Sequence, residues 1–126
     1  MFHTGVRQRL TARHFLVGDF GNETVPHSHP YDVEWVLAVR SLDENGFGVD
    51  IALMERVLAE VLSSVDNVLL NDLPDFSDRQ PSLENLAVFL EGRLRAAMGI
   101  EDRRIVNSSV QIWESDTAWA TFSVEL

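Results

Sequence analysis

The sequence contains no cysteine and no lysine, and it has no long hydrophobic run. The absence of cysteine excludes disulfides, thiolate zinc sites, iron–sulfur clusters and a cysteine nucleophile. No stretch approaches the roughly 18 consecutive apolar residues of a membrane helix, and the first ten residues lack the apolar core of a signal peptide. We therefore expect a cytoplasmic protein with no membrane partner.

Positive charge is also scarce. The 126 residues carry 20 acidic against 10 basic side chains, which gives a formal net charge of −10. A nucleic-acid partner or an anionic membrane surface would require a basic patch, so neither is expected. A chain of this length has room for one hydrophobic core, and we expect a single domain over residues 1–126.

Two amphipathic helices are the clearest local features. In the first, predicted over 49–65, hydrophobic residues recur at the three- and four-residue spacing of one buried face, made of Leu53, Met54, Val57, Leu58, Val61, Leu62 and Val65. The second is predicted between Ser82, a helix-capping residue, and Gly99, a residue that commonly ends helices. Its apolar face is Leu83, Leu86, Ala87, Leu90, Leu94 and Ala97. The loop between them is long for a compact domain, and such loops often carry function.

Four further segments have the composition or the polar–apolar alternation that is typical of strands. They cover 6–17, 32–41 and two runs within 104–125 that are separated by the turn-forming residues Ser115 and Asp116. The resulting order is ββααββ. A four-stranded antiparallel sheet with two helices on one face is a two-layer α+β domain. Assembly into a ring that continues the sheet between subunits would protect the sheet edges.

Three of the four histidines have the spacing of metal ligands. His27 and His29 are two residues apart just before a predicted strand, and His14 lies near the end of the preceding strand. Side chains two apart in an extended chain point to the same face, so the three rings can converge on one ion. Three imidazoles favour zinc, with iron, nickel or cobalt as alternatives. Without a metal, the same residues are ordinary loop and strand histidines.

Six short motifs occur in a particular order along the chain. They are His14, HSHPY at 27–31, GFGVD at 46–50, DNVLLN at 66–71, PSLENLA at 81–87 and the pair Trp113-Glu114. This order resembles the 6-pyruvoyltetrahydropterin synthase family, which includes the 6-carboxytetrahydropterin synthases of queuosine biosynthesis. The resemblance covers the chain from about residue 11 to the C-terminus.

The resemblance implies a tunnelling fold (T-fold) assembled as a homohexamer with active sites between subunits. It implies zinc held by His14, His27 and His29, and a 7,8-dihydroneopterin triphosphate substrate whose hydroxylated side chain binds the ion. Glu114 matches the residue that anchors the pterin ring, and a carboxylate suits this role because it accepts two parallel hydrogen bonds. Ser82 matches a substrate-binding position, although it reads equally well as a helix cap.

Two positions depart from the family pattern. Where the usual members carry a catalytic cysteine, four residues before the His-x-His pair, this chain has Glu23. The usual Asp-His dyad is here Asp66 and Asn67, and an amide cannot transfer a proton at a useful pH. A variant branch of the family has glutamate at the cysteine position and removes the pterin side chain to give 6-hydroxymethyl-7,8-dihydropterin, a folate precursor.

Together these features predict a zinc-dependent lyase that acts on 7,8-dihydroneopterin, its triphosphate or a related reduced pterin. Glu23 and Asp66 are its predicted catalytic residues, and Glu23 can act as the base if its surroundings raise its pKa toward neutrality. The alternative is a catalytically degenerate paralogue that retains zinc and binds a pterin or a purine-like ring. A third interpretation is a metal-stabilised subunit that serves assembly alone.

Overall fold

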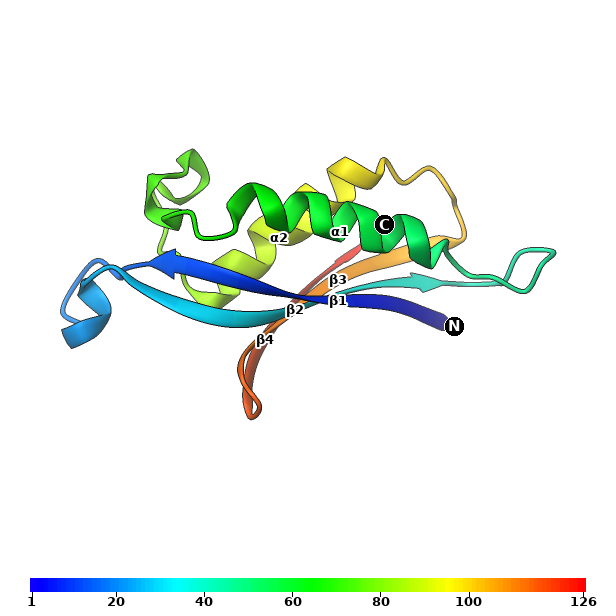
Figure 1. The fold of residues 1–126 in the computed structure, drawn as a ribbon. Coiled ribbons are helices and arrows are strands. Elements are labelled where there is room, and N and C mark those ends of the chain that lie inside the picture. Colours follow the sequence, from blue (N-terminus) through cyan, green and yellow to red (C-terminus); the bar gives the residue numbers. More distant parts are fainter.

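The computed structural model describes residues 1–126 as a four-stranded antiparallel sheet with both helices on one face (Figure 1). The strands, in spatial order, are β1 (Phe2–His14), β2 (His27–Val39), β3 (Ile105–Ser115) and β4 (Ala118–Glu125). The helices are α1 (Ile51–Val65) and α2 (Leu83–Met98). The predicted α+β class and the ββααββ order are confirmed.

The helices begin and end at residues suited to capping. The side chains of Asp50 and Ser82 each accept a hydrogen bond from the backbone N–H three residues later, which is the N-cap arrangement. Gly99 ends α2 with φ 62°, a left-handed conformation that glycine adopts without strain. Helix α1 starts at Ile51, slightly later than the predicted start at residue 49, because Asp50 is its cap.

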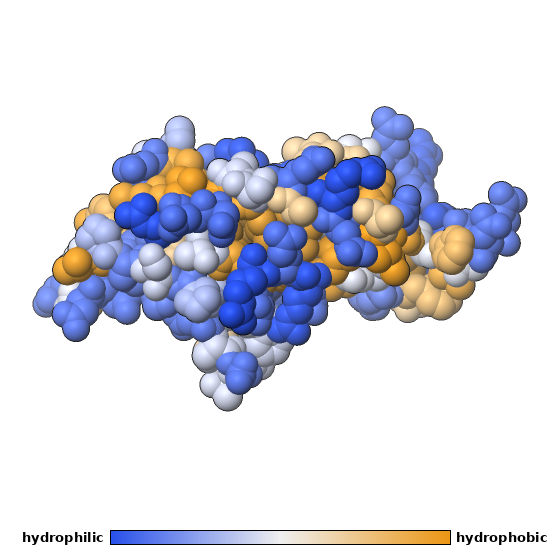
Figure 2. Space-filling model, viewed as in Figure 1, coloured by the Kyte–Doolittle hydropathy of each residue, from blue (hydrophilic) through white to orange (hydrophobic).

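The hydrophobic core lies between the helices and the sheet. Trp35 of β2 is fully buried, and its indole N–H donates to Ser108 Oγ of β3 at 3.1 Å, so burial leaves no unpaired donor there. The apolar face predicted for α1 is buried except for Leu53, which is partly buried. In α2, however, Ala97 is exposed and Glu91 is buried. Figure 2 shows hydrophilic residues over most of one face, with hydrophobic residues emerging along α1 and above the sheet.

Both strands of the first hairpin begin and end at residues other than the predicted ones, and two of these differences lie at the histidines. Strand β1 ends at His14 instead of residue 17, and β2 begins at His27, so the His-x-His pair lies inside the strand. After His14 the backbone of residues 15 and 17 bonds to side-chain amides, which take the place of a neighbouring strand. The strand-like sequence pattern therefore continues to residue 17, although the pairing of β1 with β2 ends at His14.

Strands β1 and β2 form a long hairpin whose connecting end carries the candidate site (Figure 1). The pairing is regular along both strands and places His14 opposite His27. Neither helix has the length and apolar character that spanning a bilayer requires.

Candidate metal centre

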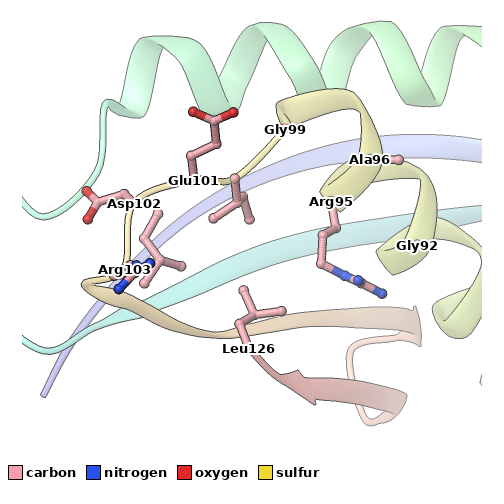
Figure 3. A pocket seen from close by; sticks show the side chains of 10 residues that line it. Gly92, Arg95, Ala96, Gly99, Glu101, Asp102, Arg103 and Leu126 are labelled. Carbon is pink, nitrogen blue, oxygen red and sulfur yellow. The ribbon is translucent and has the colours of Figure 1, made fainter.

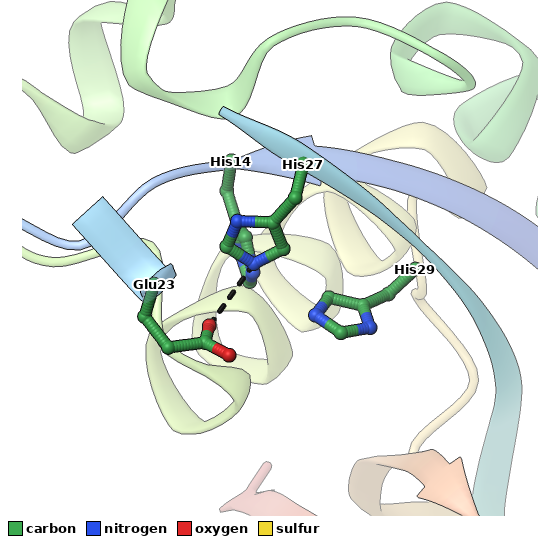
Figure 4. A group of neighbouring side chains, drawn as sticks. All are labelled: His14, Glu23, His27 and His29. Carbon is green, nitrogen blue, oxygen red and sulfur yellow. Dashed lines mark ion pairs between the residues drawn. The ribbon is translucent and has the colours of Figure 1, made fainter. Parts of the chain in front are cut away.

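The three histidines converge where the hairpin strands meet their connecting loop (Figure 4). The ring centres of His14 and His27 are 4.6 Å apart, those of His27 and His29 are 4.8 Å apart, and those of His14 and His29 are 5.4 Å apart. One nitrogen of each ring and one carboxylate oxygen of Glu23 all lie within 4.8 Å of one another. The structure thus brings together the three predicted ligands and the predicted base.

Two backbone carbonyls orient the rings. His14 Nδ1 lies 2.9 Å from the carbonyl oxygen of Pro81, and His27 Nδ1 lies 2.6 Å from that of Val25. Since a carbonyl can only accept, each Nδ1 carries the proton and each Nε2 keeps a lone pair. Both Nε2 atoms are buried without a hydrogen-bond partner. Metal-bound histidines typically have this arrangement, with the outer N–H held and the inner nitrogen free, so the residues fit a cation.

Burial keeps the ring of His14 neutral. Its pKa is lowered from the usual value of 6.5, mainly because burial disfavours the charged imidazolium. The hydrogen bond to Pro81 and the charge of Glu23 oppose this shift, while His27 and His29 add to it. A neutral imidazole is the form that binds metal ions, so no proton has to leave His14 at pH 7 before a metal can bind.

Glu23 points toward the histidines from a short 3-10 turn, Gly21–Thr24 (Figure 4). Its Oε2 lies 3.0 Å from Nε2 of His27, and the side chain is 51% exposed. Although this is an ion-pair distance, the contact lacks hydrogen-bond alignment, because the His27 nitrogen has no hydrogen-bond partner. Ligand atoms around a tetrahedral zinc ion are about 3.3–3.5 Å apart, close to this separation. Glu23 is therefore placed to act either as a fourth ligand or as a base beside the ion.

Tyr31 contacts the histidine cluster and is also affected by the charge of Glu114, the predicted pterin anchor. Its ring stacks nearly parallel on His29, with centres 5.6 Å apart and planes 11° apart. Burial raises the pKa of the Tyr31 hydroxyl, and the carboxylates of Glu114 and Glu23 raise it further. Glu114 itself is exposed near the end of β3. The exposed Glu114 carboxylate is therefore close enough to act electrostatically on Tyr31, whose ring stacks on His29.

Asp66 and Ser82 do not belong to the four-residue cluster. The Asp66 carboxylate accepts the backbone N–H of Thr11 at 2.9 Å, at the outer edge of β1, and Ser82 caps α2. Asn67 has φ 58°, a left-handed conformation that asparagine adopts more readily than most residues, and its N–H donates to Thr11 O at 2.8 Å. These residues have structural partners within the chain.

A surface hollow of about 700 Å³ lies at the C-terminal end of α2 (Figure 3). Arg95 lines it and donates to both carboxylate oxygens of the buried Glu91, at 3.0–3.3 Å. Arg103 and Leu126 also border the hollow. It contains no histidine and plays no part in the metal centre.

Comparisons with known proteins agree with this geometry. The sequence pattern of the 6-pyruvoyl tetrahydropterin synthase family matches residues 4–125. The chain is 26% identical to the 6-carboxy-5,6,7,8-tetrahydropterin synthase of Bacillus subtilis (strain 168), over 96% of this chain and 84% of that protein.

Solved structures show the same fold. The chain is similar to Plasmodium vivax 6-pyruvoyltetrahydropterin synthase, in a variant with a catalytic glutamate replaced by alanine, at TM-score 0.82 and 15% identity, over 99% of this chain and 98% of that one. It is also similar to Caenorhabditis elegans 6-pyruvoyl tetrahydropterin synthase, at TM-score 0.81 and 20% identity, over 98% and 95% of the two chains. The tunnelling fold is thereby confirmed, and the chain belongs to the 6-pyruvoyl tetrahydropterin synthase family.

Proposed function

We propose that the protein is a cytoplasmic, zinc-dependent lyase that acts on 7,8-dihydroneopterin, its triphosphate or a related reduced pterin. His14, His27 and His29 would hold the ion. The observation that carries the proposal is the pair of buried, unpartnered Nε2 atoms on His14 and His27, with the Glu23 carboxylate beside them. Zinc bound there would supply Lewis-acid stabilisation of negative charge on an oxygen of the pterin side chain.

Glu23 would act as the general base. Its carboxylate would take the proton of a side-chain hydroxyl, and the C–O bond would become a carbonyl as the adjacent carbon–carbon bond breaks. The electron pair of that bond would remain on the carbon attached to the ring, and the proton held by Glu23 would return to it. A 6-hydroxymethyl pterin and an aldehyde fragment result, with all atoms and electrons accounted for.

A relative supports a carboxylate in this role. The Plasmodium vivax structure describes a glutamate of that enzyme as a catalytic residue, so this fold accommodates glutamate chemistry. In this chain Glu23 is also the only carboxylate in the four-residue cluster. Loss of cysteine therefore does not imply loss of a base.

Glu114 would anchor the pterin ring by accepting two parallel hydrogen bonds, from the ring amino group and the neighbouring N–H. Asp66, as a catalytic residue, and Ser82, as a substrate-binding residue, would act from outside the histidine cluster. The outer edge of β1 beside Asp66 is already paired within the chain, by the contacts of Asp66 and Asn67 with Thr11 and by the Arg13–Leu69 bridge. A homohexamer, as the family resemblance implies, would extend the sheet from the part of this edge before Thr11.

A pterin- or purine-binding protein without catalysis is the second candidate. Asn67 favours it, because an amide at the dyad position cannot transfer protons.

The reaction products distinguish the lyase from the binding protein. The zinc-loaded protein is incubated with dihydroneopterin, its triphosphate and sepiapterin, and the products are identified by mass. A zinc-dependent product supports the lyase; a 6-hydroxymethyl pterin indicates folate synthesis and a 6-carboxy pterin queuosine synthesis. Tight binding with no product supports the binding protein, and no binding contradicts both.

A further inference from the structure

Two side-chain amides pair with the backbone just beyond the end of β1. Asn71 Oδ1 accepts the N–H of Phe15 at 2.9 Å, and Asn71 Nδ2 donates to the Phe15 carbonyl at 3.0 Å. Gln80 repeats the arrangement on Val17, with distances of 3.0 Å and 2.6 Å. Each primary amide presents one donor and one acceptor, as a peptide group of a neighbouring strand would. We call Asn71 and Gln80 the amide clamp.

The clamped segment holds the turn that carries Glu23. Leu16, between the two clamped residues, donates its N–H to the Glu23 carbonyl at 2.7 Å. The turn is bonded internally as well, since Glu23 N–H donates to Phe20 O at 3.2 Å and Thr24 Oγ1 donates to Gly21 O at 2.7 Å. A shift of residues 15–17 would therefore carry the Glu23 backbone with it.

Hydrogen bonds also connect Gln80 of the amide clamp to helix α2. Asn85 Nδ2, in the first turn of α2, donates to the Gln80 carbonyl at 2.9 Å. The next residue, Pro81, accepts the N–H of His14 through its own carbonyl. One loop thus orients a predicted metal ligand and supports the segment that holds Glu23.

We propose that Asn71 and Gln80 are positioning residues that hold Glu23 at the metal centre. Asn71 is the last residue of the DNVLLN motif, and the proposed reaction gives it no other role. The inference rests on the proposed role of Glu23, but the clamp can be measured without any reaction.

The test compares Gln80→Ala with wild type, using Gln8→Ala as the control because Gln8 is an exposed β1 residue outside the clamp. Gln80 is partly buried but lies outside the hydrophobic core, so its truncation leaves the core intact; the circular dichroism spectrum verifies this. Hydrogen exchange of residues 15–25 should become at least tenfold faster in Gln80→Ala and stay unchanged in the control. Unchanged exchange in Gln80→Ala would overturn the proposal.

A double-mutant cycle tests whether the clamp acts through Glu23. Zinc affinity, measured by chelator competition, should fall several-fold on Gln80→Ala in wild type and show no further loss in the Glu23→Gln background. Equal losses in both backgrounds would contradict the proposal. If wild type turns over no pterin, the proposed function fails, whereas the exchange and affinity results still decide on the clamp.

Discussion

Glu23 Oε2 faces His27 Nε2 at 3.0 Å, four residues along the chain, while the other nitrogen of the same ring is held 2.6 Å from the Val25 carbonyl. A neutral His27 with its proton on Nδ1 presents a lone pair to the carboxylate. Two electron-rich atoms at this distance repel unless a proton or a cation lies between them. The pair is therefore a site for positive charge, which a metal ion shared with His14 and His29 would provide.

Removing one imidazole should abolish stoichiometric metal binding. His29→Ala leaves two nitrogens, too few for a stable zinc site, so elemental analysis should find well below one zinc per chain after dialysis. His3→Ala is the matched control, because His3 is exposed at the far end of β1. Full zinc occupancy in His29→Ala would remove it from the ligand set.

The stability of the metal-free protein should fall on acidification below about pH 6.5. The pKa of His14 is lower in the folded state than its usual value of 6.5, so the unfolded chain takes up the proton first as the pH falls. Urea unfolding at pH 7.5 and 5.5, with a chelator present, should show this loss, and His14→Gln should show a smaller one. An identical pH dependence in both proteins would argue against a buried neutral His14.

Arg95→Met should destabilise the fold by about 1–2 kcal/mol, since it leaves the buried Glu91 carboxylate without its partner. The value is below that of a fully buried pair because the Arg95 side chain is 42% exposed. Arg93→Met is the control: its ion pair with Asp75 is exposed and should contribute at most about 1 kcal/mol. Comparable losses in both variants would mean that burial of Glu91 is not decisive.

Glu114→Gln should weaken pterin binding about 10- to 100-fold, because an amide replaces one of two charge-assisted acceptors with a donor. Fluorescence titration with a reduced pterin measures this in the zinc-loaded protein. Glu125→Gln, an exposed carboxylate near the C-terminus, should bind like wild type. An unchanged affinity in Glu114→Gln would place the ring elsewhere.

Much of the fold could be predicted because its signals are local. Apolar periodicity marks both helices, and Ser82 and Gly99 mark the limits of α2. Periodicity does not predict well how far a buried face extends around the helix. Ala97 was predicted to be buried and is exposed, whereas Glu91 is buried and paired with Arg95, one turn later. The histidine spacing likewise predicted convergence, because strand geometry alone places His27 and His29 on one face.

The environment of the site could not be predicted from spacing. Pro81 contacts His14 across 67 residues, and Asn71 contacts Phe15 across 56, so both contacts depend on the path of a loop without periodicity. The sequence also predicted that the first strand continues past His14. In the structure, Phe15 and Val17 bond to side chains and not to a neighbouring strand, which spacing alone could not indicate.

The central claim, that Glu23 is the base beside a three-histidine zinc site, is tested most directly by Glu23→Gln. Zinc content and pterin turnover are measured on the same preparations of this variant and wild type, with Glu44→Gln, in an exposed loop, as the control. The account predicts one zinc per chain in all three proteins and turnover reduced at least 100-fold in Glu23→Gln alone. Turnover at the wild-type rate in Glu23→Gln would contradict it.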